Sequence, residues 1–344
     1  MSPDLSSEDL RVVAAAIGGA GRQVTGELEA TLITSGRSNL TYAITDGASR
    51  WILRTPPRVG RTPSAHDVAR ELRVTAALAA TDVPVAAPVV LVEDETAIGI
   101  PFTVVDFVDG TAVQTQAQLD GFDDRELGDV VTSLVSTLAT LHRVSPVAVG
   151  LEGFGRPDGY AERQLRRWSR QWETVGAGEL GPLAAEVASR LEAAVPEQRA
   201  TSVVHGDYRI DNTILARDGA GDWRVAAVVD WELSTLGDPV ADVAMMCAYR
   251  HPTFDLIVGG PSAWTSDRLP SAASLAGAYE GAGGVPLADW DFHLALAYYK
   301  VAVIAAGIDH RARAGAASGA GFSTAGQTVE PYLCLALATV GASA

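Results

Sequence analysis

The chain has almost no lysine. Lysine and arginine together make up 26 of its 344 residues, and Lys300 is the single lysine. Local positive charge must therefore come from arginine. The net charge of −16 makes general binding to nucleic acid or to an anionic membrane unfavourable. Cysteine is also scarce. Cys247 and Cys334 lie in apolar helical patterns, which favours buried free thiols over a disulfide or a metal pair.

Long hydrophobic runs are absent too. The most apolar stretches, at 294–308 and 332–340, are either short for a membrane span or interrupted by polar residues. The first residues lack the basic and apolar regions of a signal peptide. We therefore expect a cytoplasmic protein with neither a membrane nor a nucleic-acid partner, whose oligomeric state stays open. A hydrophobic content of 47% over 344 residues suits about two globular domains.

The N-terminal part of the chain has the pattern of a small sheet. Short, partly alternating runs are separated by glycine-containing turn signals, and one longer segment has helical periodicity. The pattern predicts strands at 28–34, 39–45, 50–54, 89–92 and 102–107, and helices at 8–17 and 65–79. This predicts an antiparallel sheet interrupted by one helix, in a domain that covers residues 1–108.

The rest of the chain, residues 109–344, is mostly helical in pattern. Predicted helices lie at 124–142, 160–173, 183–194, 242–250, 272–281, 291–310 and 328–340, and short strands at 202–204, 213–216 and 224–229. The fold class that follows is α+β. Because ligands prefer clefts between domains, we expect the chemistry-bearing residues of both parts to face the Asp106–Gly110 junction.

Three oxygen-bearing side chains carry the chemical signal. Asp207 is followed five positions later by Asn212, and Asp230 closes an apolar run eighteen positions after that. Phosphoryl transfer needs a carboxylate to accept the acceptor's proton, together with an amide and a second carboxylate to hold Mg²⁺ on the phosphates. We therefore predict that Asp207 is the catalytic base and that Asn212 and Asp230 are metal ligands. A hydrolase with a dinuclear metal site is disfavoured, because the sequence lacks a suitable cluster of His and carboxylate residues.

These residues resemble a known family. The segment Val203–Asn212 is similar to the His-Gly-Asp-x-x-x-x-Asn loop of the aminoglycoside phosphotransferase and choline kinase superfamily. Asp230–Glu232 resembles its Asp-Trp-Glu segment, and Gly237–Ala244 its Gly-Asp-Pro-x-x-Asp helix start. The resemblance implies a bilobal protein-kinase-like fold with a nucleotide-binding N-lobe and a larger helical C-lobe that binds the substrate. It implies ATP and Mg²⁺ as cofactors, with His205 and Asp242 as structural supports of the loop.

The same resemblance assigns nucleotide contacts in the first domain. A small-residue hairpin would cover the phosphates, Arg54 would hold them with Glu71 as its acidic partner, and a hinge would meet adenine. The residues assigned are Ser35, Gly36, Ser38, Asn39, Arg54, Glu71, Asp106 and Val108. Protein kinases have lysine where this chain has Arg54. Because a planar guanidinium and a compact ammonium hold phosphate differently, a nucleotide-binding pseudokinase remains an alternative to an active kinase.

The acceptor is less well defined. On a helix, Tyr160, Arg163 and Arg167 share one face, which fits either an anion-binding wall for substrate or a solvated basic surface. Glu232 is a further substrate candidate, with a second metal or a surface role as alternatives, and Asp211 is open between loop charge and site residue. With Leu53–Pro57, the helix resembles the kinase domain of acyl-CoA dehydrogenase family members 10 and 11, which implies small hydroxyl substrates of the 4-hydroxyacyl-CoA type. An aminoglycoside is the alternative acceptor.

Overall fold

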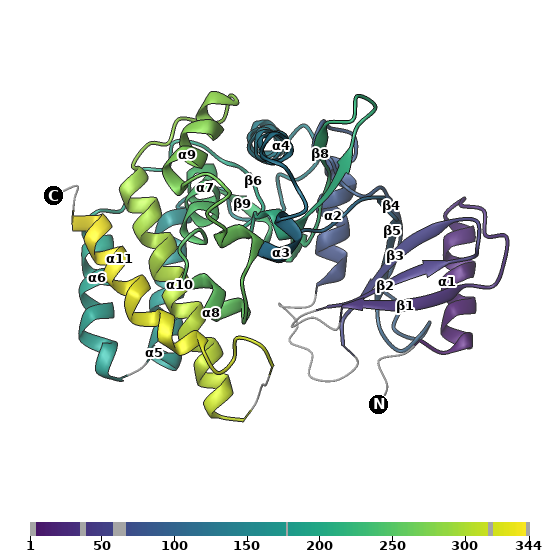
Figure 1. The fold of residues 1–344 in the computed structure, drawn as a ribbon. Helices are drawn as coiled ribbons and strands as arrows, with labels where there is room; N and C mark the ends of the chain where they lie inside the picture. The colour runs from purple at the N-terminus through teal and green to yellow at the C-terminus, as the bar shows by residue number, and fades with distance from the viewer. Residues whose placement is uncertain (1–4, 35–38, 58–66, 177, 316–318, 342–344) are drawn as a thin grey trace. The chain divides into compact units, whose positions relative to one another are not determined.

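The computed structural model describes residues 5–34, 39–57, 67–176, 178–315 and 319–341 (Figure 1). The chain forms two compact units. The first comprises residues 1–110 together with 226–234, and the second comprises 111–225 and 235–344. The sequence predicted a single boundary after residue 108. That prediction assigns residues 226–234 to the second domain, whereas they pack with the first unit.

The first unit contains a five-stranded antiparallel sheet with the order β1-β2-β3-β5-β4. The strands are β1 (Glu29–Thr34), β2 (Leu40–Thr45), β3 (Arg50–Thr55), β4 (Pro88–Val92) and β5 (Phe102–Asp106). The turn between β2 and β3 is held by Asp46, whose carboxylate accepts hydrogen bonds from the amides of Ala48 and Ser49. This local hydrogen bonding is typical of aspartate in turns and fixes the register that pairs Thr45 with Arg50.

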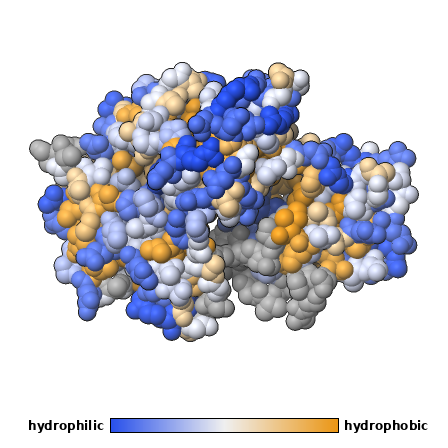
Figure 2. All heavy atoms as spheres, in the orientation of Figure 1, coloured by the Kyte–Doolittle hydropathy of each residue, from blue (hydrophilic) through white to orange (hydrophobic). Residues whose placement is uncertain are grey.

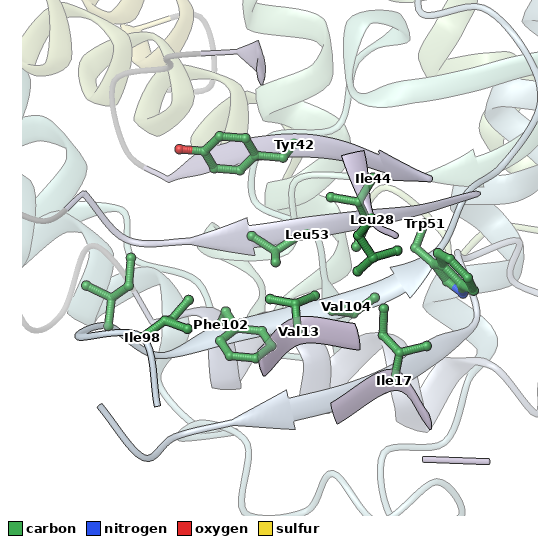
Figure 3. Close-up of a cluster of buried hydrophobic side chains, with 11 residues drawn as sticks. Val13, Ile17, Leu28, Tyr42, Ile44, Trp51, Leu53, Ile98, Phe102 and Val104 are labelled. Atoms are coloured by element: carbon green, nitrogen blue, oxygen red, sulfur yellow. The ribbon is translucent and has the colours of Figure 1, made fainter. Parts of the chain in front are cut away.

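The helices α1 (Ser7–Gly19) and α2 (Val68–Leu78) cover opposite faces of this sheet (Figure 1). Successive strand residues point to opposite faces. Leu53 of β3 packs in a core with Val13 and Ile17 of α1 (Figure 3), whereas its neighbour Arg54 contacts Glu71 of α2. The alternation therefore places one charged side chain of β3 on the side of α2.

The segment 226–234 is tied to α2 and its surroundings. The amide of Val228 donates a 2.8 Å hydrogen bond to the carbonyl oxygen of Pro84. Arg70 of α2 donates to the carbonyl oxygen of Ser234 at 3.1 Å, and the indole of Trp231 donates to the carbonyl oxygen of Val228 at 3.0 Å. These bonds hold the short loop that carries Asp230 against α2.

The second unit is mostly helical. Its helices are α3 (Gln116–Leu119), α4 (Asp124–Arg143), α5 (Tyr160–Val175), α6 (Gly181–Ala193), α7 (Pro239–Ala248), α8 (Phe254–Val258), α9 (Ala272–Gly281), α10 (Trp290–Arg313) and α11 (Val329–Gly341). The long helix α10 packs against α5, α7 and α11 (Figure 1). Short strands β6 (Ser202–Val204) and β9 (Thr235–Gly237) pair, as do β7 (Thr213–Arg217) and β8 (Trp223–Val228). On the face shown in Figure 2, hydrophilic side chains gather over α4.

The predicted helices and strands correspond to observed ones, but α3, α8 and β9 were not predicted. Each is too short to show a periodic hydrophobic pattern. Among the described residues, α10 is the helix whose length and composition would allow it to cross a membrane, and 72% of its most apolar window is buried inside the protein. The prediction of two buried thiols is correct for Cys247 and wrong for Cys334, which is exposed.

Candidate active site

The loop 205–212 follows directly from β6 and is held by a residue of α7. One carboxylate oxygen of Asp242 accepts a hydrogen bond from the amide of His205 at 2.6 Å, and the other accepts one from the amide of Gly206 at 2.7 Å. Gly206 has a φ of 83°, a conformation that favours glycine over other residues. Asp242 therefore fixes the backbone that leads into Asp207.

Asp242 is itself supported from α4 and α9. His142 Nε2 lies 3.2 Å from its carboxylate, and His142 Nδ1 lies 2.7 Å from the hydroxyl of Tyr279. Burial acts to raise the pKa of Asp242. The hydrogen bond from His142 and the backbone donors outweigh burial and lower the pKa. The network therefore holds an ionised carboxylate in the protein interior beneath the loop.

Asp207 and Asn212 are joined across the loop. The side-chain amide of Asn212 donates to the main-chain oxygen of Asp207 at 2.8 Å and to its carboxylate at 3.0 Å. Burial raises the pKa of Asp207, and the charge of Asp211 adds to this rise, while Arg209 opposes it. A raised pKa makes this carboxylate a stronger base, which suits a group that accepts a proton.

Arg209 is a site residue that the sequence analysis missed. Its guanidinium lies 3.2 Å from the Asp207 carboxylate and binds both oxygens of Asp211, at 2.9 and 3.0 Å. It also lies over the rings of Tyr249 and Phe254, with 4.8 and 5.1 Å from its carbon to the ring centroids. Asp211 is thus a bidentate partner of Arg209 and not a solvent-facing loop charge. The alternation of Asp207, Arg209 and Asp211 in the sequence is the pattern that could have indicated this arginine.

In the first unit, Arg54 bridges two carboxylates. Its Nη1 lies 2.9 Å from Glu71, and its Nη2 donates to Asp230 at 3.1 Å. Glu71 is 6% exposed, so it is not a solvent-facing helix charge, and it accepts a 2.7 Å hydrogen bond from the side-chain amide of Asn39. Burial acts to lower the pKa of Arg54, but the two carboxylates outweigh it and raise that pKa.

Asp230 has an unusual backbone. Its φ of 65° and ψ of 55° are left-handed values, which aspartate adopts more readily than most residues and which often mark functional positions. Its side chain is 37% exposed. Glu232 lies in the same short segment and acts electrostatically on Arg54 and Glu71. Glu232 therefore shares the electrostatic environment of Arg54 and Glu71.

The other predicted nucleotide contacts are only partly described. Ser35, Gly36 and Ser38 lie outside the described residues. The Asp106 carboxylate forms a 2.6 Å ion pair with Arg22, and its amide donates to the carbonyl oxygen of Ala87. Within the described part of the chain, the amide of Val108 forms no backbone hydrogen bond. The hinge contact of Val108 with adenine stays a prediction.

The three predicted substrate residues of α5 do not form one exposed face. Tyr160 is buried, and a Cβ on Gly237 would lie only 2.7 Å from its ring. Arg163 donates to the carbonyl oxygen of Arg156 at 2.6 Å. Arg167 is exposed and lies beside the Trp168 ring. Of the three, Arg167 is the one whose residue is exposed.

The donor set fits Mg²⁺, which takes oxygen ligands and usually retains several waters. The nitrogen of the Asn212 side chain donates to Asp207, and an amide oxygen is the kind of ligand that the prediction for Asn212 requires. Asp230 offers a carboxylate that is more than one third exposed. Among the described residues, no group of three or more His, Cys, Asp or Glu side chains forms a complete metal cluster.

Comparison with known proteins shows the family of the chain. The sequence profile of the phosphotransferase enzyme family matches residues 29–293. The chain belongs to this family. Its fold is the α+β, kinase-like fold of the aminoglycoside phosphotransferases.

Three curated relatives are named as acyl-CoA dehydrogenases and not as phosphotransferases. The chain is 34% identical over 320 residues to mouse acyl-CoA dehydrogenase family member 10, 32% over 293 residues to human family member 11, and 31% over 302 residues to the Arabidopsis thaliana IBR3 protein, a probable acyl-CoA dehydrogenase by name. These matches cover 92, 83 and 82% of this chain but only 30, 37 and 36% of the relatives. The chain therefore spans about a third of the length of these relatives.

Solved structures resemble the whole chain. A Ralstonia eutropha protein assigned as an aminoglycoside phosphotransferase is 31% identical, with a TM-score of 0.82 and coverage of 96% of this chain and 98% of that one. The phosphotransferase APH(4)-Ia, in a ternary complex with AMP-PNP and hygromycin B, is 14% identical, with a TM-score of 0.60 and coverage of 98 and 99%. At 14% identity, the second likeness supports the fold alone.

Proposed function

We propose that this protein transfers the γ-phosphate of ATP to a hydroxyl group of a small molecule in a reaction that depends on Mg²⁺. The observation that carries the proposal is the geometry of the loop 205–212, in which Asp242 fixes the backbone and Asn212 orients the Asp207 carboxylate. In this proposal residues 1–108 are the nucleotide-binding lobe, residues 109–344 form the catalytic and substrate lobe, and the protein acts in the cytoplasm.

The reaction assigns one role to each group. The acceptor oxygen bonds to the γ-phosphorus, the bond from that phosphorus to the bridging oxygen breaks to release ADP, and the acceptor proton goes to Asp207. Bound Mg²⁺ would neutralise phosphate charge, and Asn212 and Asp230 are the residues that would hold it. Arg54, whose two nitrogens each bind a carboxylate, can present a planar cation to the phosphates. Its pairing with buried Glu71 keeps it in place.

For the acceptor we propose a hydroxyacyl-CoA thioester. Two observations support this class over a polycationic aminoglycoside. The curated relatives that match most of the chain carry acyl-CoA dehydrogenase in their names, and α5 presents Arg167 as an exposed cation. An oxygen-rich, anionic acceptor is complementary to such a cation, whereas an amino sugar is repelled by it.

The test is a mass-spectrometric screen for ATP-dependent gain of one phosphate over hydroxyacyl-CoA thioesters, aminoglycosides and amino alcohols. Wild-type protein should phosphorylate a hydroxyacyl-CoA thioester, and Asp207→Ala should not. Arg125→Ala, a change at an exposed arginine of α4, serves as the control and should retain activity. Tight ATP binding without transfer to any hydroxyl in the panel would contradict the proposed enzyme and favour a nucleotide-binding pseudokinase.

A further inference from the structure

The single lysine of the chain lies beside the loop that carries Asp207. Lys300 belongs to α10, and its Nζ lies 3.5 Å from the carbonyl oxygen of Gly206. That distance is long for a hydrogen bond with a cationic donor, since such bonds are usually about 2.7–2.9 Å. An ammonium group carries three donors, so this weak contact leaves most of the hydrogen-bonding capacity of Lys300 available.

The surroundings of Lys300 are cationic and aromatic. Its Nζ lies 5.6 Å from the centroid of the Trp168 ring of α5, and the guanidinium carbon of Arg167 lies 5.3 Å from the same ring. Two cations therefore share one indole. Since like charges repel, this arrangement is favourable mainly when an anion or an electron-rich oxygen lies near both.

Within the described residues, no carboxylate pairs directly with Lys300. Among the ion pairs formed within the described parts of the chain, none includes Lys300, although α10 places it partly inside the protein. The carboxylates of Asp207 and Asp242 favour its charged form from a distance, and Arg167 disfavours it. Burial is the largest effect and lowers the pKa of Lys300. A partly buried cation without a counterion is costly unless a ligand supplies one.

We propose that Lys300, with Arg167 at its side, binds a carbonyl, carboxylate or phosphate oxygen of the acceptor and thereby selects anionic acceptors next to Asp207. This inference rests on the proposed phosphotransferase function and adds a specificity residue to it. Every residue involved belongs to the second unit. The alternative is that Lys300 only supports the Gly206 carbonyl, and the tests below separate the two.

The first test uses the fact that Lys300 is the one lysine. Trinitrobenzenesulfonate modifies free amines, so peptide mass spectrometry after labelling reports Lys300 separately from the N-terminal amine. A 4-hydroxyacyl-CoA thioester should slow labelling of Lys300 by roughly fivefold or more, because an amine that donates to a ligand is shielded. Mg-ATP alone should leave the rate unchanged. A thioester that is phosphorylated without protecting Lys300 overturns the inference.

The second test compares Lys300→Met, Lys300→Arg and the control Arg311→Met, which removes an exposed cation from the same helix. Loss of a charged hydrogen bond should raise the KM of the thioester on the order of tenfold to a hundredfold. The KM for ATP should stay constant, Lys300→Arg should be intermediate, and Arg311→Met should match wild type. A fall in kcat accompanied by a change in the KM for ATP shows that Lys300 only supports the loop, and overturns the inference.

Hygromycin B provides a cationic comparison. It should neither protect Lys300 nor become phosphorylated, and protection together with phosphorylation would refute anionic selectivity. Failure of the wild-type protein to phosphorylate any probe refutes the proposed function and the inference together. Phosphorylation that is indifferent to Lys300 refutes the inference alone.

Discussion

The side-chain amide of Asn212 donates hydrogen bonds to both the main-chain oxygen and the carboxylate of Asp207, at 2.8 and 3.0 Å. This relationship does two things. It fixes the orientation of the proposed base, and it turns the amide nitrogen away from any metal, so that the remaining oxygen is the atom that can bind Mg²⁺. A single asparagine therefore connects the proposed sites of proton transfer and metal binding.

Removing the Asp242 carboxylate, which holds the loop 205–212, should destabilise the protein. Asp242→Asn leaves one buried backbone amide without its charged acceptor, and we expect it to lower the free energy of unfolding by about 2–4 kcal/mol. Urea denaturation measures this change. Asp124→Asn, at a carboxylate whose side chain is 99% exposed, should change the free energy of unfolding little. Equal effects of the two substitutions would show that the Asp242 network does not stabilise the loop.

The pairing of Arg54 with Glu71 can be separated from phosphate binding. Arg54→Met leaves Glu71 buried without its cation. Measured above pH 7, where Glu71 of the wild type is ionised, the change should lower the free energy of unfolding by roughly 3 kcal/mol. The double variant Arg54→Met with Glu71→Met should recover much of that loss, because no unpaired charge remains. Its affinity for ATP, measured by calorimetry, should stay as weak as in the single variant. Recovery of ATP binding in the double variant would rule out a direct role of Arg54 on the phosphates.

Glu71 should also make stability depend on pH. Burial raises the pKa of Glu71 from an ordinary 4.5 to about 7. Between these values the unfolded chain releases the proton while the folded protein retains it. The contribution of Glu71 is therefore fully present below pH 4.5 and is lost as pH rises towards 7, by at most about 1.4 kcal/mol per pH unit. The free energy of unfolding of Glu71→Gln minus that of wild type should increase up to about pH 7 and then level off. Parallel curves for the two proteins would contradict the raised pKa.

The proposal that Asn212 and Asp230 hold the same metal ion predicts that their effects on metal binding are coupled. If both hold one ion with the nucleotide, Asn212→Ala and Asp230→Ala should each weaken Mn²⁺ binding in the presence of ADP. The double variant should then lose less than the sum of the two single losses, because the second change acts on an ion already released. Electron paramagnetic resonance of free Mn²⁺ measures these affinities. Strictly additive losses would mean that the two residues act on different ions or not on an ion.

Most of the helices and strands and the loop 205–212 could be predicted from sequence patterns. The side-chain contacts around them could not. The spacing of Asp207, Asn212 and Asp230 is local, so it is visible in the chain. The partners of Arg209 are not, because Tyr249 and Phe254 reach it only through the packing of α7 and α8. The sequence likewise placed Tyr160 with Arg163 and Arg167 on one helical face, whereas packing against Gly237 buries Tyr160.

The neighbours of Lys300 also could not be predicted from the sequence. In the sequence it interrupts an apolar helix, and this is a sign that a buried segment carries a polar function. Its neighbours Gly206 and Trp168 lie 94 and 132 positions away along the chain, and no periodic pattern links them. Only the packing of α10 against α5 and against the loop reveals the arrangement.

The central claim is that Asp207 accepts the acceptor's proton during phosphoryl transfer. Transfer of label from γ-³²P-ATP to the acceptor found in the screen, measured for wild type and Asp207→Asn with ATP affinity determined on the same samples, tests it most directly. The account predicts that kcat falls by about 10²-fold or more while the Kd for ATP changes little. Undiminished transfer by Asp207→Asn would contradict it.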